Sequence, residues 1–249
     1  MSDNKINTEV INGEIFQTIY KNTFIINELR KTSYENMEYI GETIEKEVKI
    51  ILRELITSIT TRNFYAYILR EMMRNVPEHS EAEKIELTIY KTNNKIAFKV
   101  KDNGIGIMDS LNTNPAYNIG NDQTALSFAI RPGISRSYKR DPNRDSVWQN
   151  SGFGLYMVSN IMKKIGYFQL CSGEYTVKIK GEFNNNDFYK NKKIKGTEVV
   201  VIINEDVKIN IPETLKNISQ KGSEEAKERK FAPYANIKTA SQASTLIEE

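Results

Sequence analysis

Apolar residues in the amino-terminal part of the chain recur at steps of three or four, the spacing that places side chains on one side of a helix. The pattern predicts a first helix over residues 14–30 and a longer second helix after a capping box made by Thr32 and Glu35. The apolar stripe of the second helix consists of Met37, Ile40, Ile44, Val48, Ile51, Leu55 and Ile59. Because this stripe must be buried, we expect residues 1–62 to form a helical hairpin that packs within the chain or against a second copy of it.

A third helix is predicted over residues 63–76. Glu71, Asn75 and His79 are spaced by four, so their side chains would share one flank if the helix continued that far. Pro77 argues against continuation, because a proline inside a helix removes a backbone donor and clashes with the preceding turn. We therefore expect the helix to kink or end near Asn75.

Alternating apolar and polar residues predict two strands, over 84–91 and 95–101, joined by a short turn. Residues 108–151 are mostly polar, and only 123–130 among them are expected to be helical. The remaining predicted elements are a helix over 152–166 and strands over 167–171, 175–180 and 197–204. Residues 63–204 would then form one domain. Residues 205–249 would be a partly disordered tail, with a short helix over 212–220 and a solvated charged run after it.

Composition narrows the function classes only a little. The chain has 249 residues, enough for one substantial core, and its 35 basic and 32 acidic residues argue neither for nor against nucleic acid. Nothing in the sequence resembles a recognition helix or a base-stacking surface. A single cysteine excludes an internal disulfide and a cysteine-based zinc site. We find no signal peptide, and the longest apolar run is too short to span a membrane, so we expect a cytoplasmic protein without membrane contact.

A glycine-rich turn at the end of the second predicted strand is a candidate binding site. The strand ends at Asp102, and Gly104 and Gly106 then allow the backbone to turn tightly and approach a ligand. Alone, the pattern is a weak signal of function, because a solvated turn after an edge strand uses the same residues. Neither glycine pair in the chain has the third glycine of a dinucleotide fingerprint, and no Gly-x4-Gly-Lys-Ser/Thr loop occurs.

Three further motifs occur in order around this turn: Glu71–Asn75 followed by His79, Ser151–Leu155, and Lys195–Val200. Together the four resemble the N, G1, G2 and G3 boxes of the GHKL ATP-binding superfamily, which includes gyrase, the large heat-shock chaperones, histidine kinases, MutL and the anti-sigma serine kinases. The resemblance covers roughly residues 60–204. It implies a two-layer α/β sandwich of the Bergerat type, with a mixed sheet and helices on one face, that binds ATP and Mg²⁺.

The resemblance also implies roles for residues at the two ends of the nucleotide. Asp102 would accept a hydrogen bond from the adenine amine, and Thr197 would join the same water network. The alternative for Thr197 is an ordinary β-branched strand residue. The positions implied to contact the nucleotide are Asp102, Gly104, Gly106, Ile107, Ser151, Gly152, Phe153, Gly154, Leu155 and Thr197.

For the phosphate end, the resemblance implies that Asn75 holds Mg²⁺ and that Glu71 is the general base acting on water or on a substrate hydroxyl. The alternative for Glu71 is an exposed helix glutamate paired with Arg70 or Arg74. His79 would form part of the site wall.

Residues 108–151 fall where this superfamily has its ATP lid. The lid's basic residues are Arg131, Arg136, Lys139, Arg140 and Arg144, and any of them would be able to neutralise charge on the γ-phosphate.

Three functions remain open on this basis. The first is a slow, Mg²⁺-dependent ATPase whose lid closure regulates a protein partner. The second is a serine/threonine kinase of the anti-sigma type, and the third is an ATP sensor without turnover. A self-phosphorylating histidine kinase is disfavoured because the amino-terminal helices contain no histidine. The residues after Asn204 are too few to build the transducer domain of gyrase and MutL. A homodimer through the amino-terminal helices is one possible assembly.

Overall fold

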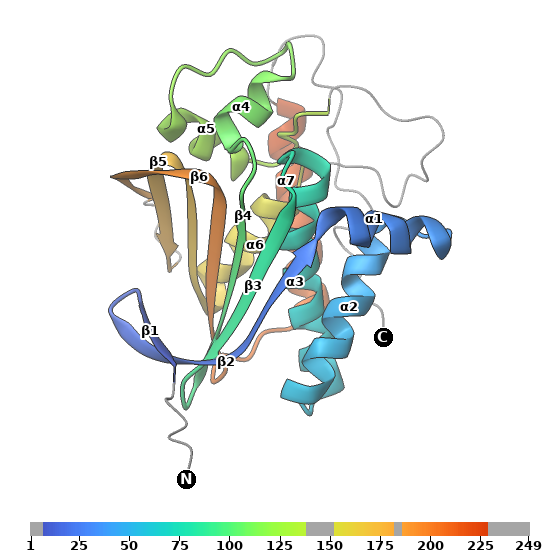
Figure 1. Ribbon diagram of the computed structural model, residues 1–249. Helices are drawn as coiled ribbons and strands as arrows, with labels where there is room; N and C mark the ends of the chain where they lie inside the picture. The colour runs from blue at the N-terminus through green and yellow to red at the C-terminus, as the bar shows by residue number, and fades with distance from the viewer. Residues whose placement is uncertain (1–6, 138–151, 182–185, 229–249) are drawn as a thin grey trace.

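The computed structural model describes residues 7–137, 152–181 and 186–228, which form a curved six-stranded sheet with helices on one face (Figure 1). The strands are β1 (Thr8–Ile11), β2 (Glu14–Ile25), β3 (Lys84–Lys91), β4 (Lys95–Asp102), β5 (Gly166–Lys180) and β6 (Asp187–Asn204). The helices are α1 (Ile26–Glu35), α2 (Ile40–Leu55), α3 (Ile59–His79), α4 (Ile107–Asn112), α5 (Asp122–Ala129), α6 (Gly154–Ile165) and α7 (Ile211–Glu228). The predicted two-layer α/β sandwich is confirmed.

The strand order is β1-β2-β3-β4-β6-β5, and every pairing between described strands is antiparallel. This corrects the mixed arrangement expected for the sheet. β5 runs in the same direction as β4, but the other arm of its hairpin, β6, lies between them and is antiparallel to both. The two arms are also longer than the predicted strands, since the pairing of β5 continues from Gly166 to Lys178.

The prediction of a helix over residues 14–30 is wrong. Residues 14–25 form strand β2, which pairs with β3 along most of its length, and only the last part of the predicted segment is helical. A register shift between Thr18 and Tyr20 explains the misleading pattern, because an extra residue in a strand breaks the alternation of its two faces. Phe16 and Phe24 consequently pack on opposite faces of the sheet. Residues 1–62 are therefore not a separate helical hairpin.

The second predicted helix corresponds to α2, which is shorter than its apolar stripe. Ile44, Val48 and Leu52 are fully buried, and α2 packs on α1 and α3 within the chain. Met37 and Ile59, at the two ends of the stripe, are exposed. The capping interaction also differs from the prediction, because the backbone N–H of Tyr39 donates to Glu42 at 2.8 Å.

Helix α3 passes through Pro77 and ends at His79, which corrects the expected break near Asn75. The last turn of α3 is stabilised by a side chain from α1 and by Ser80, the residue that follows the helix. Arg30 donates to the Pro77 carbonyl at 3.1 Å, and the backbone N–H and hydroxyl of Ser80 both donate to the Val76 carbonyl. These contacts offset the donor that proline lacks.

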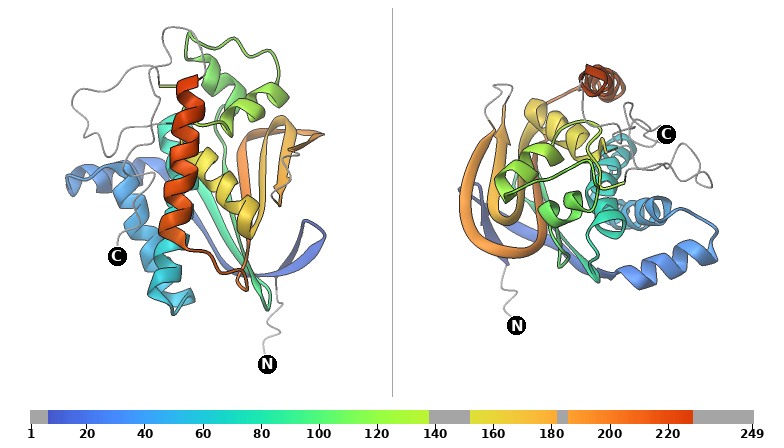
Figure 2. Two further views of the ribbon diagram at one scale, coloured as in Figure 1. Left: turned by 180° about the vertical axis from the view of Figure 1, so that it is seen from behind. Right: turned by 90° about the horizontal axis from the view of Figure 1, so that it is seen from above.

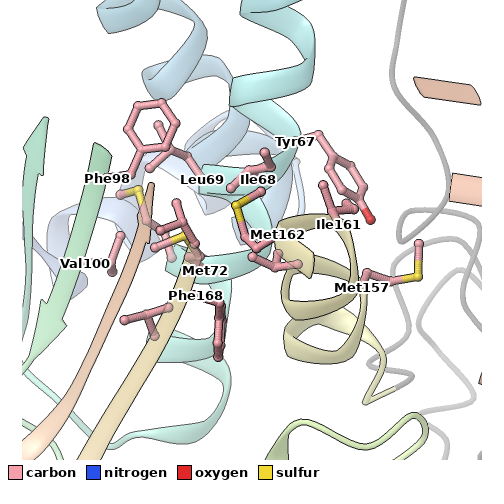
Figure 3. Packing of buried hydrophobic residues seen from close by; sticks show 14 of the residues in the cluster. Tyr67, Ile68, Leu69, Met72, Phe98, Val100, Met157, Ile161, Met162 and Phe168 are labelled. Carbon is pink, nitrogen blue, oxygen red and sulfur yellow. The ribbon is translucent and has the colours of Figure 1, made fainter. Parts of the chain in front are cut away.

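The main core lies between the sheet and helices α3 and α6 (Figure 3). Met72 of α3 and Met162 of α6 meet Phe98, Val100 and Phe168 from the sheet there. A smaller cluster on the other face of the sheet joins β1 to the central strands and includes Ile11, Phe16, Tyr90 and Val200. Both faces of β3, β4 and β6 are therefore buried over part of their length.

The segment after β6 is more ordered than predicted. Helix α7 extends to Glu228, runs beside α6 and buries Leu215, Ile218, Gly222 and Ala226 (Figure 2). The charged run that was expected to be solvated is thus partly helical, and its first residue, Gly222, packs against Tyr156 of α6. Within the described parts of the chain, no helix has both the length and the apolar character needed to cross a membrane.

Candidate functional site

A pocket lies where the end of β4, the last turns of α3, the start of α6 and strand β6 meet. It encloses about 770 Å³ of empty space, part of which is open solvent. The pocket brings together residues from all four sequence motifs. The predicted residues that line it are Asn75, Asp102, Gly106, Ile107, Gly152, Gly154, Leu155 and Thr197.

Asp102 forms the buried acidic wall of the pocket. Its Oδ1 accepts the backbone N–H of Gly104 at 2.8 Å, and the backbone N–H of Thr197 also donates to the carboxylate. Burial nevertheless raises the pKa of Asp102 to about 6, because desolvation outweighs these two hydrogen bonds. The carboxylate is therefore fixed in position but is poorly solvated, as expected for a group that awaits a donor from a ligand.

Gly104 does not line the pocket. A side chain there would collide with the Ser80 carbonyl, the same oxygen that accepts the Ile105 N–H at 2.8 Å. Its role in this structure is to let the turn after β4 pack against the end of α3. The neighbouring Gly106 and Ile107 do line the pocket.

Ser172 is a contributor that the sequence did not indicate. Its hydroxyl accepts the Ile107 N–H at 3.0 Å and donates to the Gly196 carbonyl at 3.1 Å. It therefore ties the first glycine turn to strand β6, one residue from Thr197. A serine in a strand carries no periodic or motif signal, so only the pairing of β5 with β6 reveals it.

The second glycine motif builds the start of α6. Gly152, Gly154 and Leu155 line the pocket, and the residue before the helix, Phe153, offers no capping side chain. A helix N-terminus of this kind favours anions, because its first N–H groups have no partner within the helix and the positive end of the helix dipole lies there. Phe153 itself is fully buried and packs on Tyr156, so it supports the turn from behind. Ser151 lies outside the described residues.

Asn75 lines the pocket from α3. Its amide nitrogen donates to the Glu71 carbonyl at 2.6 Å, an interaction that leaves Oδ1 as the free acceptor. An amide oxygen is a suitable ligand for a hard cation such as Mg²⁺. Among the described residues, no cluster of three or more His, Cys, Asp or Glu side chains has the arrangement of a metal site. A cation at Asn75 would therefore take its other ligands from phosphates and water.

Glu71 is fully buried, so it is not the exposed helix glutamate of the alternative considered above. It does pair with Arg70 and Arg74, as that alternative supposed. Its Oε1 accepts from Arg70 at 3.1 Å and lies 3.6 Å from Arg74. Arg70 is held in turn by Glu45 of α2, at 2.6 Å. Among the described residues, Oε2 of Glu71 has no hydrogen-bond partner. It faces Gly154, where an added Cβ would lie 2.8 Å away.

His79 and Arg136 form the wall opposite the glycine turns. Arg136 donates to the His79 carbonyl at 2.8 Å and pairs with Glu81 at 3.1 Å, which joins the lid segment to the end of α3. Burial lowers the pKa of His79 to about 4, so its ring is neutral at pH 7. Arg136 is the lid cation that lines this pocket, whereas Arg131 stacks on Phe128 outside it. The other basic lid residues, Lys139, Arg140 and Arg144, lie outside the described residues.

Comparison with known proteins agrees with this geometry. The family model described as histidine kinase-, DNA gyrase B-, and HSP90-like ATPase matches residues 60–207. The matched region contains every element that lines the pocket and excludes β1, β2, α1, α2 and α7. A search of curated proteins found no match.

Proposed function

Because the chain belongs to the histidine kinase-, DNA gyrase B-, and HSP90-like ATPase family, we propose that it is a slow, Mg²⁺-dependent ATPase that regulates a protein partner through closure of its lid. Membership in the family supports ATP binding and ATPase-like chemistry in general. The slow rate, the dependence on Mg²⁺ and the regulation of a protein partner are parts of this proposal.

One observation carries the proposal: the four motifs converge on a single pocket whose two ends differ in chemistry. Asp102 and Thr197 supply a buried acceptor at one end. The start of α6, with Asn75 and Glu71 beside it, supplies an anion site and a cation ligand at the other. ATP has the matching polarity, with an amino group on its base and negative charge on its phosphates.

At the base end, the Asp102 carboxylate accepts the adenine amine. Guanine presents an oxo group at the same place, which would bring two acceptors together without a proton between them. The site should therefore discriminate ATP from GTP, with Ser172 and Thr197 keeping the acceptor in position.

At the phosphate end, the backbone N–H groups of Gly154 and Leu155 bind the phosphate oxygens. Asn75 Oδ1 would be the protein ligand of Mg²⁺, which when bound neutralises the phosphate charge. The remaining coordination positions belong to water and to the nucleotide.

For hydrolysis, Glu71 Oε2 accepts a proton from a water molecule as the water oxygen bonds to the γ-phosphorus and the bond to the bridging oxygen breaks. The ion pairs of Oε1 with Arg70 and Arg74 fix the carboxylate, so that Oε2 is the oxygen left for this task. The absence of a side chain at Gly154 leaves the approach from Oε2 to the phosphates open. Arg136 lines the pocket from the lid and is suited to stabilise the developing charge.

The lid is the proposed link to a partner. Residues of α4, of α5 and of the segment up to Arg136 line the pocket, and Arg136 anchors this segment to α3. Binding of the γ-phosphate by Arg136 would compete with its bond to the His79 carbonyl, so the lid has two alternative sets of contacts. A homodimer through α1 and α2 remains part of the proposal, since Met37, Tyr34 and Ile50 on these helices and the turn between them are exposed.

The test is incubation of the purified protein with ATP labelled on the γ-phosphate, with Mg²⁺ and with EDTA. Release of labelled phosphate in Mg²⁺ alone is the expected result. Transfer of the label to a protein would identify a kinase of the anti-sigma type instead. Tight binding of intact ATP without release or transfer would make the protein a sensor and would overturn the proposed hydrolysis.

A further inference from the structure

A second hollow lies beside α6 and shares no lining residue with the nucleotide pocket. It is bounded by the end of α5, one side of α6, the β5–β6 hairpin and helix α7, which runs along α6 (Figure 2). We call this hollow the α6–α7 groove. Its empty space is about 1770 Å³, part of which is open solvent.

The groove is strongly basic. Arg131, Lys163, Lys164 and Lys221 line it, and Glu225 is the one acidic residue among the described residues that do so. Lys163 is half-buried, and its pKa is lowered by burial and by the charge of Lys221, although the charge of Glu225 acts in the opposite direction. Lys163 and Lys221 therefore repel each other at a partly desolvated place, and Glu225 offsets only part of that repulsion. An anionic ligand would relieve that repulsion.

The groove also has an apolar floor between its charges. The side chains that form this floor are Ile130, Pro132, Tyr156, Ile179, Phe188 and Ile218. Most of these side chains are buried, so they offer a shallow apolar strip and do not project into solvent. A ligand that matches the strip has apolar groups interleaved with negative charges.

We propose that the α6–α7 groove docks an acidic, partly apolar peptide segment of a protein partner. The inference deepens the proposed function, on which it rests for the existence of a protein partner. Nucleic acid fits less well, because single strands are held by longer basic tracks with aromatic stacking surfaces, and the floor of this groove is mainly aliphatic. Lys221 and Glu225 belong to α7, which lies beyond the residues matched by the family model, so one wall of the groove is built outside the matched domain.

The position of the groove connects it to the nucleotide pocket. Arg131 and Pro132 directly precede the segment that brings Ile134, Ser135 and Arg136 into that pocket. α6 likewise contributes its first turn to the pocket and its later turns to the groove. A peptide in the groove would thus contact the two elements that respond to the γ-phosphate.

The experiment is selection of short displayed random peptides on the full-length protein without nucleotide. Selected peptides are then synthesised with a fluorophore, and their affinities are measured by anisotropy for three proteins. These are the wild type, the groove variant Lys163→Glu/Lys221→Glu, and the control Lys208→Glu/Lys216→Glu. The control changes net charge equally at two exposed lysines outside the groove.

We expect the selected peptides to be rich in Asp, Glu and apolar residues. Their binding should weaken by roughly tenfold or more in the groove variant, should change little in the control, and should weaken as salt rises. Failure to select acidic peptides, equal losses in both variants, or tighter binding of single-stranded DNA than of the peptides would overturn the proposal. ATP binding by both variants verifies folding. Because the selection uses no ATP, its failure leaves the proposed ATPase activity untouched.

Discussion

Glu71 Oε2 and Gly154 meet across the interface of α3 and α6, so closely that a Cβ on Gly154 would lie 2.8 Å from the carboxylate oxygen. The two residues are far apart in sequence and belong to different motifs. Their contact places a buried carboxylate directly behind the helix N-terminus that the site offers to phosphates. The catalytic role proposed for Glu71 depends on this contact.

Glu71→Gln should abolish most turnover while leaving ATP affinity nearly unchanged. The amide keeps an acceptor for Arg70 but is a poor base, and loss of a positioned base typically lowers a rate by about 10²- to 10⁴-fold. Phosphate release and equilibrium binding of ATP are the measurements. Glu78→Gln, a loss of charge on the same helix, is the matched control and should leave turnover largely intact. Equal losses in both variants would contradict the assignment.

Asp102→Asn should weaken ATP binding without unfolding the protein. The new amide still accepts the Gly104 N–H through its oxygen, but its NH₂ group would face the adenine amine as a second donor. Loss of a hydrogen bond to a charged group predicts a roughly 10- to 100-fold weaker affinity. Calorimetric titration measures it, and Asp109→Asn, an exposed change nearby, serves as the control. Unchanged affinity in Asp102→Asn would place the base elsewhere.

ATP affinity should also fall as the pH is lowered through about 6. The pKa of Asp102 is raised to about 6, so the carboxylate is ionised at pH 7.5 and mostly protonated at pH 5. If binding requires the ionised form, the affinity drops by roughly tenfold between these values. His79 does not interfere, because its pKa of about 4 keeps it neutral across the range. In Asp102→Asn, only the nucleotide phosphates still titrate over this range. If ATP affinity depended on pH in the same way in the wild type and in Asp102→Asn, ionisation of Asp102 would not be the cause.

Asn75→Ala should reduce ATP affinity in Mg²⁺ much more than in EDTA. The substitution removes the Oδ1 proposed to bind the cation and leaves Asp102 and the start of α6 unchanged. Binding measured in the two buffers gives the comparison without any further variant. A loss of the same size in both buffers would show that Asn75 shapes the pocket and does not hold a metal.

Gly222→Ala should destabilise the protein, although alanine is the better helix former by up to about 1 kcal/mol. A Cβ at this position would come within 2.5 Å of the Tyr156 ring and 3.0 Å of the Phe153 ring. Overpacking of this kind typically costs about 1–3 kcal/mol, so we expect a lower free energy of unfolding and weaker ATP binding through Phe153. Denaturant unfolding measures the effect, with Ser223→Ala on the same helix as the control. A stabilised Gly222→Ala would mean that α7 is not firmly packed on the G2 motif.

The residues that line the pocket were largely predictable from sequence because their signals are local. Asp102, Gly106, Gly152, Gly154 and Thr197 stand in short motifs whose residue types reflect what the backbone requires at those positions and what the proposed ligand would require. All five line one pocket. Ser172 and the chain of ion pairs from Glu45 through Arg70 to Glu71 could not be predicted, because each depends on elements brought together only by folding.

The sequence by itself determined the layering of the fold, most of its helices and the motifs of the site, since periodicity and glycine placement act over a few residues. Only the tertiary structure decided that residues 14–25 are a strand, that α3 continues through Pro77, and that α7 packs on α6. In each case a distant contact outweighs a local preference: pairing with β3, the bond from Arg30 to the Pro77 carbonyl, and the fit of Gly222 against Tyr156. Local propensities amount to about 1 kcal/mol or less per residue, so the combined contacts of a paired strand or a packed helix override them.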